Sequence, residues 1–408
     1  MILGRVSLLD CLVFLVFLVP QLLYNVGFRD LILCGLRALP FLVIKLPLGF
    51  FYEQFLVSKE ERPPFVKQAS YFEDIVIRCV RYAFANIPAS IGRVFFSKAV
   101  ALPFLRFRML RHGYVRSPIS WREVKMGNLN GLWIVGDESS KPDIVVYYAH
   151  GGGFSMGSSY FYLEFLMVWL TLLKKSGYRN PAIFSLEYSL VGNSTRDACF
   201  PVQMNEAILG YKYVISIIGD PSRVCVGGDS AGATLILSML LQLANTRKTK
   251  CADVDNPDVP GMAVLISPWT TLTSPLHKNT RSDYLDTATL EGYAHQYAGT
   301  HRQGSKEKEI CITDPIISPG DCISPAWWRS ASPSKGYFMT YGSEEVFANE
   351  IRKAVNQLRK ANVIASTKEA EGGIHAWPVA ALFLSRTPEA RQRGLHIIVQ
   401  EIRKRMGD

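Results

Sequence analysis

The sequence lacks the patterns that mark several common kinds of site. None of its eight cysteines forms a C-x-x-C pair or another metal-type spacing, so we expect neither a metal nor any other cofactor. There is no dense basic tract with interleaved aromatic residues, which argues against nucleic acid as a partner. Internal repeats and low-complexity tracts are also missing. The cysteine count leaves the redox compartment open.

Charge is modest and hydrophobic residues are plentiful. Of 408 residues, 20% are charged and 48% hydrophobic, which is enough for one large α/β domain with additions or for two domains. The net charge of +10 lies in scattered Lys and Arg and in the stretch Arg391–Arg405. A basic surface beside an apolar N-terminus suits an anionic membrane face, although solubilising charge explains it equally well.

Residues 1–57 are unlike the rest and predict a membrane anchor or interfacial segment. Val6–Phe28 barely reaches the roughly 20 apolar residues that a membrane span needs. Leu31–Phe51 carries charges and is interrupted by Pro40 and Pro47, so it suits an interfacial or re-entrant segment better. We therefore expect a membrane-associated protein, of the endoplasmic reticulum.

Two other interpretations of the first apolar segment stay open. Arg5 and the run Cys11–Val19 are similar to the basic and apolar regions of a cleaved signal peptide, but no small-x-small cleavage site follows Pro20. A buried helix of a soluble protein has the same composition.

Residues 58–118 have helical apolar spacing. Ser70–Ile91 and Phe95–Arg111 are expected to be amphipathic, aromatic-rich helices. Such helices could cover the mouth of a substrate site, or they could simply pack against the core or a membrane.

From residue 119 to 408 the pattern predicts an α/β domain with a mainly parallel sheet covered on both faces. Residues 270–320 interrupt the alternation and are expected to be an insertion. The expected strands are Trp121–Lys125, Gly131–Val135, Asp143–Ala149, Ala182–Tyr188, Arg223–Gly227, Ala263–Ser267, Gly336–Tyr341 and Val363–Lys368.

Gly228–Gly232 (Gly-Asp-Ser-Ala-Gly) lies between a short apolar strand and an apolar helix. A G-x-S-x-G sequence in that context is typical of a nucleophilic serine on a strained turn, here Ser230. Gly228 and Gly232, on either side of Asp229 and Ala231, would let the strand and the helix approach closely. An ordinary capping serine in a glycine-rich turn is the alternative.

A glycine-rich loop directly follows the strand Asp143–Ala149. Gly151, Gly152 and Gly153, together with Ala231 after the serine, could present backbone N–H groups to an oxyanion. His150 is expected to organise this loop rather than to catalyse. A phosphate-binding loop is less favoured because the Lys-Ser/Thr ending is missing.

A nucleophilic serine needs a base and a residue that orients the base. His375 follows the last expected strand and a glycine turn, so it is our candidate base. The loop after Gly336–Tyr341 carries Glu345, our first choice as the acid, and Glu344, our second. Spacing alone does not say which glutamate faces inward.

Taken together, these residues resemble the hormone-sensitive-lipase branch of α/β-hydrolases, from about Ser120 to the C-terminus. The resemblance is strongest to membrane-anchored fungal-type steryl acetyl hydrolases and arylacetamide-deacetylase-like esterases. It implies Ser230 as nucleophile, His375 as base, an acid at Glu345 where the branch usually has Asp, and a cap over the site. The matching segments are His150–Gly153, Gly228–Gly232, Ser267–Trp269, Asp283–Leu285, Asp314–Pro319 and Tyr341–Phe347.

The sequence thus predicts a membrane-associated serine esterase for a hydrophobic small-molecule ester, such as an acetylated sterol or polycyclic natural product. An amide deacetylase, an acyltransferase and a ligand-binding pseudo-hydrolase remain as alternatives. Asn193, in an Asn-Ser-Thr sequon, is a possible glycosylation site if the domain is luminal. The oligomeric state cannot be deduced.

Overall fold

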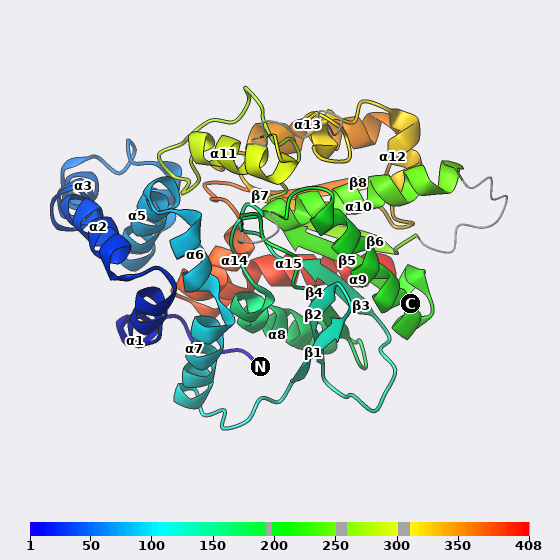
Figure 1. The fold of residues 1–408 in the computed structure, drawn as a ribbon, viewed down its shortest axis with the longest axis horizontal. Helices are drawn as coiled ribbons and strands as arrows, with labels where there is room; N and C mark the ends of the chain where they lie inside the picture. Colours follow the sequence, from blue (N-terminus) through cyan, green and yellow to red (C-terminus); the bar gives the residue numbers. More distant parts are fainter. Residues whose placement is uncertain (193–197, 250–258, 301–310, 408) are drawn as a thin grey trace.

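A central eight-stranded sheet runs through the molecule (Figure 1). The computed structural model describes residues 1–192, 198–249, 259–300 and 311–407. The strand order is β1-β2-β4-β3-β5-β6-β7-β8; β2 runs antiparallel to β1 and β4, and all other neighbours are parallel. The strands are Ser120–Met126 (β1), Leu129–Val135 (β2), Val145–Ala149 (β3), Ala182–Leu186 (β4), Val224–Asp229 (β5), Met262–Ile266 (β6), Tyr337–Gly342 (β7) and Ala365–Ala370 (β8).

The expected α/β fold is confirmed, and each predicted strand is present within two residues of its predicted bounds. Strands β3 to β7 are buried along their whole length. Parallel strands covered on both faces read as continuous apolar runs, which is why the sequence identified them.

Helices cover both faces of the sheet. One face packs against α9, α10, α12 and α13, and the other against α8, α14 and α15. These helices, and α11 of the insertion, are Ser159–Lys175 (α8), Val202–Ile218 (α9), Ser230–Thr249 (α10), Thr287–Ala298 (α11), Pro325–Ala331 (α12), Ala348–Lys360 (α13), Trp377–Leu384 (α14) and Pro388–Met406 (α15); short 3-10 turns occupy Pro221–Arg223 and Pro319–Asp321.

The N-terminal apolar residues form a helical hairpin. It consists of α1 (Leu8–Asn25) and one long helix, Phe28–Leu56; both are long and apolar enough to cross a membrane, with a mean hydropathy of 1.9. The long helix contains α2 (Phe28–Pro40), a π-helical turn (Phe41–Lys45), α3 (Leu46–Phe51) and a second π-helical turn (Tyr52–Leu56).

The expected break in the second apolar segment is therefore wrong. The helix continues through Pro40 and Pro47. A proline removes one intrahelical N–H and crowds the carbonyl four residues earlier. The widened π-helical turn Phe41–Lys45 lies between the two prolines, and such turns are a usual way for a helix to accommodate a local defect.

Four further helices connect the hairpin to the sheet: α4 (Pro64–Gln68), α5 (Tyr71–Asn86), α6 (Ala89–Phe96) and α7 (Lys98–Arg111). The predicted helix Ser70–Ile91 is divided into α5 and α6. Ile87 is extended because the proline that follows it, Pro88, disfavours helical geometry at the preceding residue.

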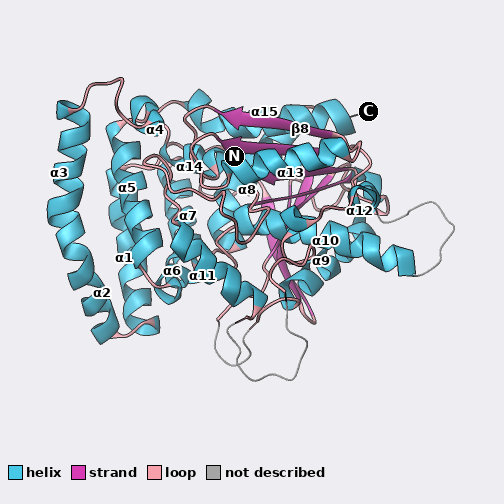
Figure 2. Ribbon diagram, turned by 90° about the horizontal axis from the view of Figure 1, so that it is seen from above, coloured by secondary structure: helices cyan, strands magenta, loops and turns pink. Residues whose placement is uncertain are grey.

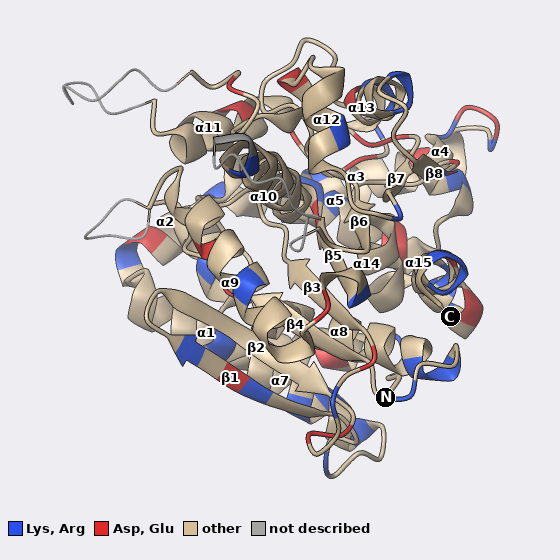
Figure 3. Ribbon diagram, turned by 90° about the vertical axis from the view of Figure 1, so that its right-hand side faces the viewer, with Lys and Arg blue, Asp and Glu red and all other residues tan. Residues whose placement is uncertain are grey.

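Lys and Arg are interspersed with Asp and Glu on the face shown in Figure 3. Among the described residues, the free thiols include Cys11, Cys34, Cys79, Cys199, Cys225 and Cys311, the last of these in the insertion. Cys251 and the sequon at Asn193 lie outside the described residues.

The buried face of α8 gives a test of this core. Leu166→Ala should lower the free energy of unfolding by about 2–5 kcal/mol, because Leu166 is fully buried and its loss leaves a cavity. Leu276→Ala is a matched control, since Leu276 is 38% exposed, and should cost less than about 1 kcal/mol. Urea unfolding followed by circular dichroism measures both. Equal losses would contradict the packing.

Candidate active site

Ser230 stands at the turn from β5 into α10. Its φ of 52° lies in the left-handed region that non-glycine residues rarely adopt, so the turn is strained. A Cβ on Gly228 would lie 2.6 Å from the Ala149 carbonyl oxygen, and one on Gly232 would lie 2.1 Å from it. The end of β3 therefore requires both glycines. A Cβ on Gly228 would also lie 2.7 Å from the Gly232 carbonyl carbon in α10, which is the close approach of strand and helix that the sequence predicts.

Asp229 joins this turn to the glycine-rich loop. Its Oδ1 accepts hydrogen bonds from the Tyr148 hydroxyl (2.7 Å) and the Gly151 N–H (2.8 Å), and its Oδ2 accepts one from the Tyr162 hydroxyl (2.6 Å). Burial raises the pKa of Asp229 to about 6, outweighing these donors. The buried carboxylate thus fixes the loop against the turn.

This contact corrects one expectation. The Gly151 N–H points to Asp229 and is not free to bind an oxyanion. Gly152 (φ 119°) and Gly153 (φ 60°) adopt conformations that suit glycine. Among the described residues, no hydrogen bond uses the N–H of Gly152, Gly153 or Ala231, so these three donors remain for a ligand.

His150 is fully buried in the loop. Its ring stacks on Tyr188 with centroids 4.4 Å apart, and its carbonyl accepts a hydrogen bond from the Tyr188 hydroxyl at 2.8 Å. Burial lowers the pKa of His150 to about 4, so the ring is neutral. These contacts fix His150 within the loop, and its role as the organiser of the loop stays a prediction.

Sheet register brings the other candidates to the same edge. Asp229 pairs with Ile266 across β5 and β6, and Gly342 pairs with Ala370 across β7 and β8. The loops after these parallel strands therefore leave from the same end of the sheet, where α/β folds bind ligands. Glu345 lies in the loop after β7 and His375 in the loop after β8.

Glu345 rather than Glu344 faces the histidine. Its Oε2 lies 4.0 Å from Nδ1 of His375, and both side chains are buried. That oxygen also accepts hydrogen bonds from the Ser267 hydroxyl (2.5 Å) and the Gly342 N–H (3.0 Å). The 4.0 Å separation is longer than a hydrogen bond, and His375 Nδ1 has no other partner among the described residues.

Burial controls the electrostatics of this pair. It lowers the pKa of His375 to about 3 and raises that of Glu345 well above the ordinary value. The donors on Ser267 and Gly342 act in the opposite direction on Glu345, because they stabilise the carboxylate. The imidazole is therefore neutral at rest, as a general base must be.

Two residues for which the sequence predicted no role, Ser267 and Asp283, join the loop that carries Glu345 to the loop that carries His375. The Ser267 hydroxyl, which donates to Glu345, accepts a hydrogen bond from the Ala376 N–H at 2.9 Å. Asp283 accepts hydrogen bonds from the N–H groups of His375 and Val346, both at 2.9 Å. In the sequence, both residues lie in segments that match the hormone-sensitive-lipase branch, Ser267–Trp269 and Asp283–Leu285. That match did not indicate which contacts they make.

The N-terminal helices and the insertion meet beside this edge. Tyr293 of α11 packs on Gly153, where an added Cβ would lie 2.6 Å from its ring, and Phe84 of α5 contacts Tyr293 edge-on. Arg93 of α6 donates to the Ser155 carbonyl at 2.7 Å. An additional cavity of about 280 Å³ lies elsewhere, between α2 and α5–α6.

Comparison with known proteins places the chain in a family. The family model for steryl acetyl hydrolases matches residues 132–384, more than half of the chain. The chain belongs to this family. The matched region of this steryl acetyl hydrolase family member contains Ser230, Glu345 and His375.

Curated relatives agree with this family. Steryl acetyl hydrolase 1 of Saccharomyces cerevisiae is 24% identical over 220 residues, which are 53% of this chain and 48% of the relative. An acetyl-hydrolase of Streptomyces hygroscopicus is 27% identical over 263 residues, 62% of this chain and 74% of the relative. The chain spans about half to three-quarters of the length of these relatives.

Solved structures share the fold. The crystal structure of an esterase from the bacterial hormone-sensitive lipase family superposes with a TM-score of 0.60 and 22% identity, covering 83% of this chain and 99% of that one. Carboxyl esterase 2 of Tuber melanosporum superposes with a TM-score of 0.55 and 18% identity, covering 72% of this chain and 88% of that one. At these identities the likeness shows the α/β-hydrolase fold, and the predicted resemblance is confirmed.

The hydrogen bonds of Asp283 predict a positioning role. Asp283→Ala should reduce kcat by about 100-fold with a smaller change in KM, because it frees both the His375 and the Val346 backbone. Asp283→Asn keeps one acceptor oxygen, so its kcat should lie between those of the unaltered protein and Asp283→Ala. Asp286→Ala is the control, since this nearby carboxylate caps α11. Steady-state kinetics on p-nitrophenyl acetate measure the effect, and thermal unfolding of each variant measures its stability. A loss of activity that merely follows the loss of stability would refute the positioning role.

Proposed function

We propose that this chain is a serine hydrolase that cleaves acetyl or other short acyl esters of hydrophobic alcohols. The observation that carries the proposal is the convergence of Ser230, the paired Glu345 and His375, and three unpaired backbone N–H groups at one edge of the sheet. Membership of the steryl acetyl hydrolase family supports acetyl as the acyl group. The aromatic rings beside Gly153 support a hydrophobic alcohol, such as a sterol or another polycyclic compound.

Acylation would begin with attack of the Ser230 hydroxyl oxygen on the ester carbonyl carbon. His375 takes the hydroxyl proton, and the N–H groups of Gly152, Gly153 and Ala231 bind the resulting oxyanion. When the tetrahedral intermediate collapses, the ester C–O bond breaks. The alcohol then leaves with the proton returned by His375, and the acyl group stays on Ser230.

Deacylation repeats this chemistry with water. His375 removes a proton from the water as it attacks the acyl carbon, and then returns the proton to the departing Ser230 oxygen. Glu345 carries no bond-making role. Its carboxylate would close the 4.0 Å gap to the Nδ1–H of the transient imidazolium, since catalytic hydrogen bonds often tighten only during reaction.

Membrane association is part of the proposal. The apolar residues 1–57, with their two long apolar helices, support attachment to a lipid surface, and a lipophilic substrate would be concentrated there. Location at the endoplasmic reticulum and use of the Asn193 sequon stay predictions. A glycosidase-sensitive mass shift would test the second.

Ser230→Ala should lower the rate of p-nitrophenyl acetate hydrolysis by roughly 10⁴- to 10⁶-fold, because no nucleophile remains for the acyl-enzyme. Ser216→Ala, on the exposed surface of α9, is the matched control and should keep full activity. Labelling by a fluorophosphonate probe should be lost only in Ser230→Ala. Full turnover in that variant, or no labelling of the unaltered protein, would overturn the proposal.

The same assays separate the alternative activities. Equal or faster cleavage of a matched amide would favour a deacetylase. Transfer of the acyl group to an added alcohol in preference to water would favour an acyltransferase. An unlabelled, inactive but sterol-binding protein would favour a pseudo-hydrolase.

The buried base also predicts the pH dependence. Burial lowers the pKa of His375 to about 3, so the base stays unprotonated well below the ordinary imidazole value of about 6.5. We therefore expect kcat/KM to be largely retained between pH 8 and pH 6, whereas an ordinary histidine would lose most of it. Asp283, whose pKa burial raises to about 6, also titrates nearby. The pH profile of kcat/KM is therefore also measured for Asp283→Asn, in which this carboxyl group no longer titrates. A midpoint at 6.5 or above in both proteins would contradict the buried base.

A further inference from the structure

The hairpin of residues 8–56 bears an extensive exposed apolar surface. Most of the large hydrophobic side chains that are exposed in the described residues lie here, among them Tyr24 (87% exposed), Leu8 (73%) and Phe28 (69%). Soluble proteins rarely leave so large an apolar surface in water. Figure 2 shows α2 and α3 as the outermost column of the molecule, beside α5 and α1.

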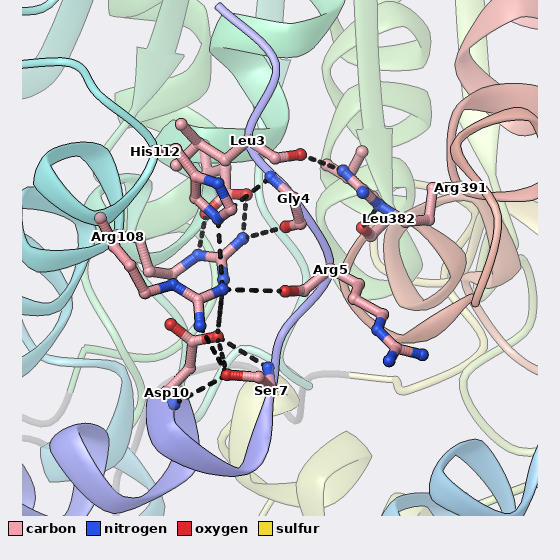
Figure 4. A network of polar contacts seen from close by, with 11 residues as sticks. Leu3, Gly4, Arg5, Ser7, Asp10, Arg108, His112, Leu382 and Arg391 are labelled. Carbon is pink, nitrogen blue, oxygen red and sulfur yellow. Dashed lines mark hydrogen bonds and ion pairs between the residues drawn. The ribbon is translucent and has the colours of Figure 1, made fainter.

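The beginning of the hairpin is fixed inside the catalytic domain. Asp10, in the first turn of α1, is fully buried; its Oδ2 lies 3.3 Å from Arg108 and 3.0 Å from Arg111, both on α7. Arg108 also forms a two-fold hydrogen bond with Glu164 of α8, at 2.8 Å each. Figure 4 shows Arg108 beside Asp10 and Ser7 at the start of α1. Ser7 completes a capping box with Asp10. Withdrawing α1 would leave Arg108 buried beside one partner fewer, which is strongly unfavourable.

The residues before α1 are buried as well. Leu3 is 2% exposed, and its carbonyl accepts a hydrogen bond from Arg391 of α15. The Gly4 N–H donates to His112 at 3.2 Å, and the Val6 N–H donates to the Phe383 carbonyl at 3.1 Å. The segment that precedes α1 therefore lies on the same side of any membrane as the catalytic domain.

The second helix of the hairpin packs lengthwise against α5. Around the middle of the helix, the Tyr82 hydroxyl donates to the Arg37 carbonyl at 2.9 Å, and the Tyr82 ring stacks on Phe41 with centroids 4.2 Å apart. Near its C-terminal end, the Gln54 side chain donates to the buried Asp74 of α5 at 2.8 Å. The contacts thus extend from Arg37 to Gln54, over the C-terminal two-thirds of the helix.

The same interface contains ion pairs. Glu53 pairs with Arg78 of α5, and its other oxygen lies 2.6 Å from Arg281 of the insertion. Arg81, one turn further along α5, donates to the Asp283 carbonyl at 2.6 Å. A helix bound along such neighbours cannot cross the hydrocarbon core unless charged α5 enters it too.

Length and charge point the same way. The helix Phe28–Leu56 has 29 residues, about 44 Å, which exceeds the roughly 30 Å of the hydrocarbon core. Lys45 lies near its middle and is exposed, where a spanning helix would place it at the centre of the bilayer. On a helix that lies flat, Lys45 and Arg37 can reach lipid headgroups, which also fits a net charge of +10.

We infer that residues 8–56 form a monotopic membrane-binding face: the hairpin lies flat in one leaflet, with the preceding residues and the catalytic domain on the same side. The occupant of the apolar surface is a lipid bilayer. This inference rests on the membrane association proposed above and not on the hydrolase chemistry.

Depth measurements test the flat orientation. Single cysteines replace Val16, Tyr24, Val43 and Leu56 in full-length protein whose native cysteines are alanine and whose esterase activity is retained. They carry nitroxide labels and bind mixed phosphatidylcholine–phosphatidylserine vesicles. A flat hairpin places all four about 5–10 Å below the phosphates. Val43 at about 15 Å, with Leu56 at the interface, would show a spanning helix and overturn the inference.

Sidedness is tested with a membrane-impermeant maleimide. Protein carrying Arg5→Cys or Ile364→Cys, both exposed positions, is inserted into sealed microsomes during synthesis. We expect both cysteines to react from the same side, either both before the membrane is opened with detergent or both only after it. Reaction of Arg5→Cys and Ile364→Cys from opposite sides would show that α1 spans alone and would overturn the inference.

A matched pair of charge substitutions tests the bilayer as the occupant. Val43→Glu, on the hairpin, should reduce vesicle binding at least about tenfold. Val115→Glu, at an exposed valine outside the hairpin, should not reduce it. Both variants should hydrolyse p-nitrophenyl acetate normally. A stable dimer that covers the hairpin and excludes vesicles would overturn the inference. The hydrolase proposal would survive that result, because it fails only if Ser230 proves inactive.

Discussion

The buried carboxylate of Asp229 is the contact on which the candidate active-site edge of the sheet depends. It lies directly before Ser230, yet it binds Tyr148 from β3, Tyr162 from α8 and the backbone of Gly151. One side chain therefore holds the serine turn, the neighbouring strand, a covering helix and the glycine-rich loop in fixed relation. A carboxylate with no solvent is costly unless several donors surround it, and this requirement makes the arrangement specific.

The loops that carry Glu345 and His375 follow the same principle, without a hydrogen bond between these two side chains. Ser267 and Asp283 each form hydrogen bonds with both loops: Ser267 with Glu345 and the Ala376 N–H, and Asp283 with the N–H groups of Val346 and His375. The backbone around His375 is therefore fixed before any substrate binds. Preorganised polar groups in a dry site are worth more than the same groups in water, since little reorganisation is needed during reaction. Burial, which lowers the pKa of His375, leaves the imidazole neutral until a proton arrives.

The fold and part of the site could be predicted from local pattern alone. Apolar runs identified the strands, and short glycine-containing motifs pointed to Ser230 and His375 as candidate site residues, because the geometry of such segments is determined within a few residues. Contacts between distant segments were not predictable: Asp283 and His375 are 92 positions apart. The choice of Glu345 over Glu344, and the occupation of the Gly151 N–H, required knowledge of which way each group points. The continuity of the helix at Pro40 and Pro47 likewise needed the backbone itself.

The docking of the hairpin on α5 has a consequence for handling the protein. Removing residues 1–57 is the usual way to make such a chain soluble, but here it would uncover Asp74 and Arg78 on α5 and leave Arg108 without Asp10. Helix α5 also touches the insertion through Arg81 and Phe84. A shortened protein would therefore differ from the full chain in solubility, and also in the packing of α5 and the insertion beside the candidate active site. Detergent-solubilised full-length protein is the sounder material for comparing substrates.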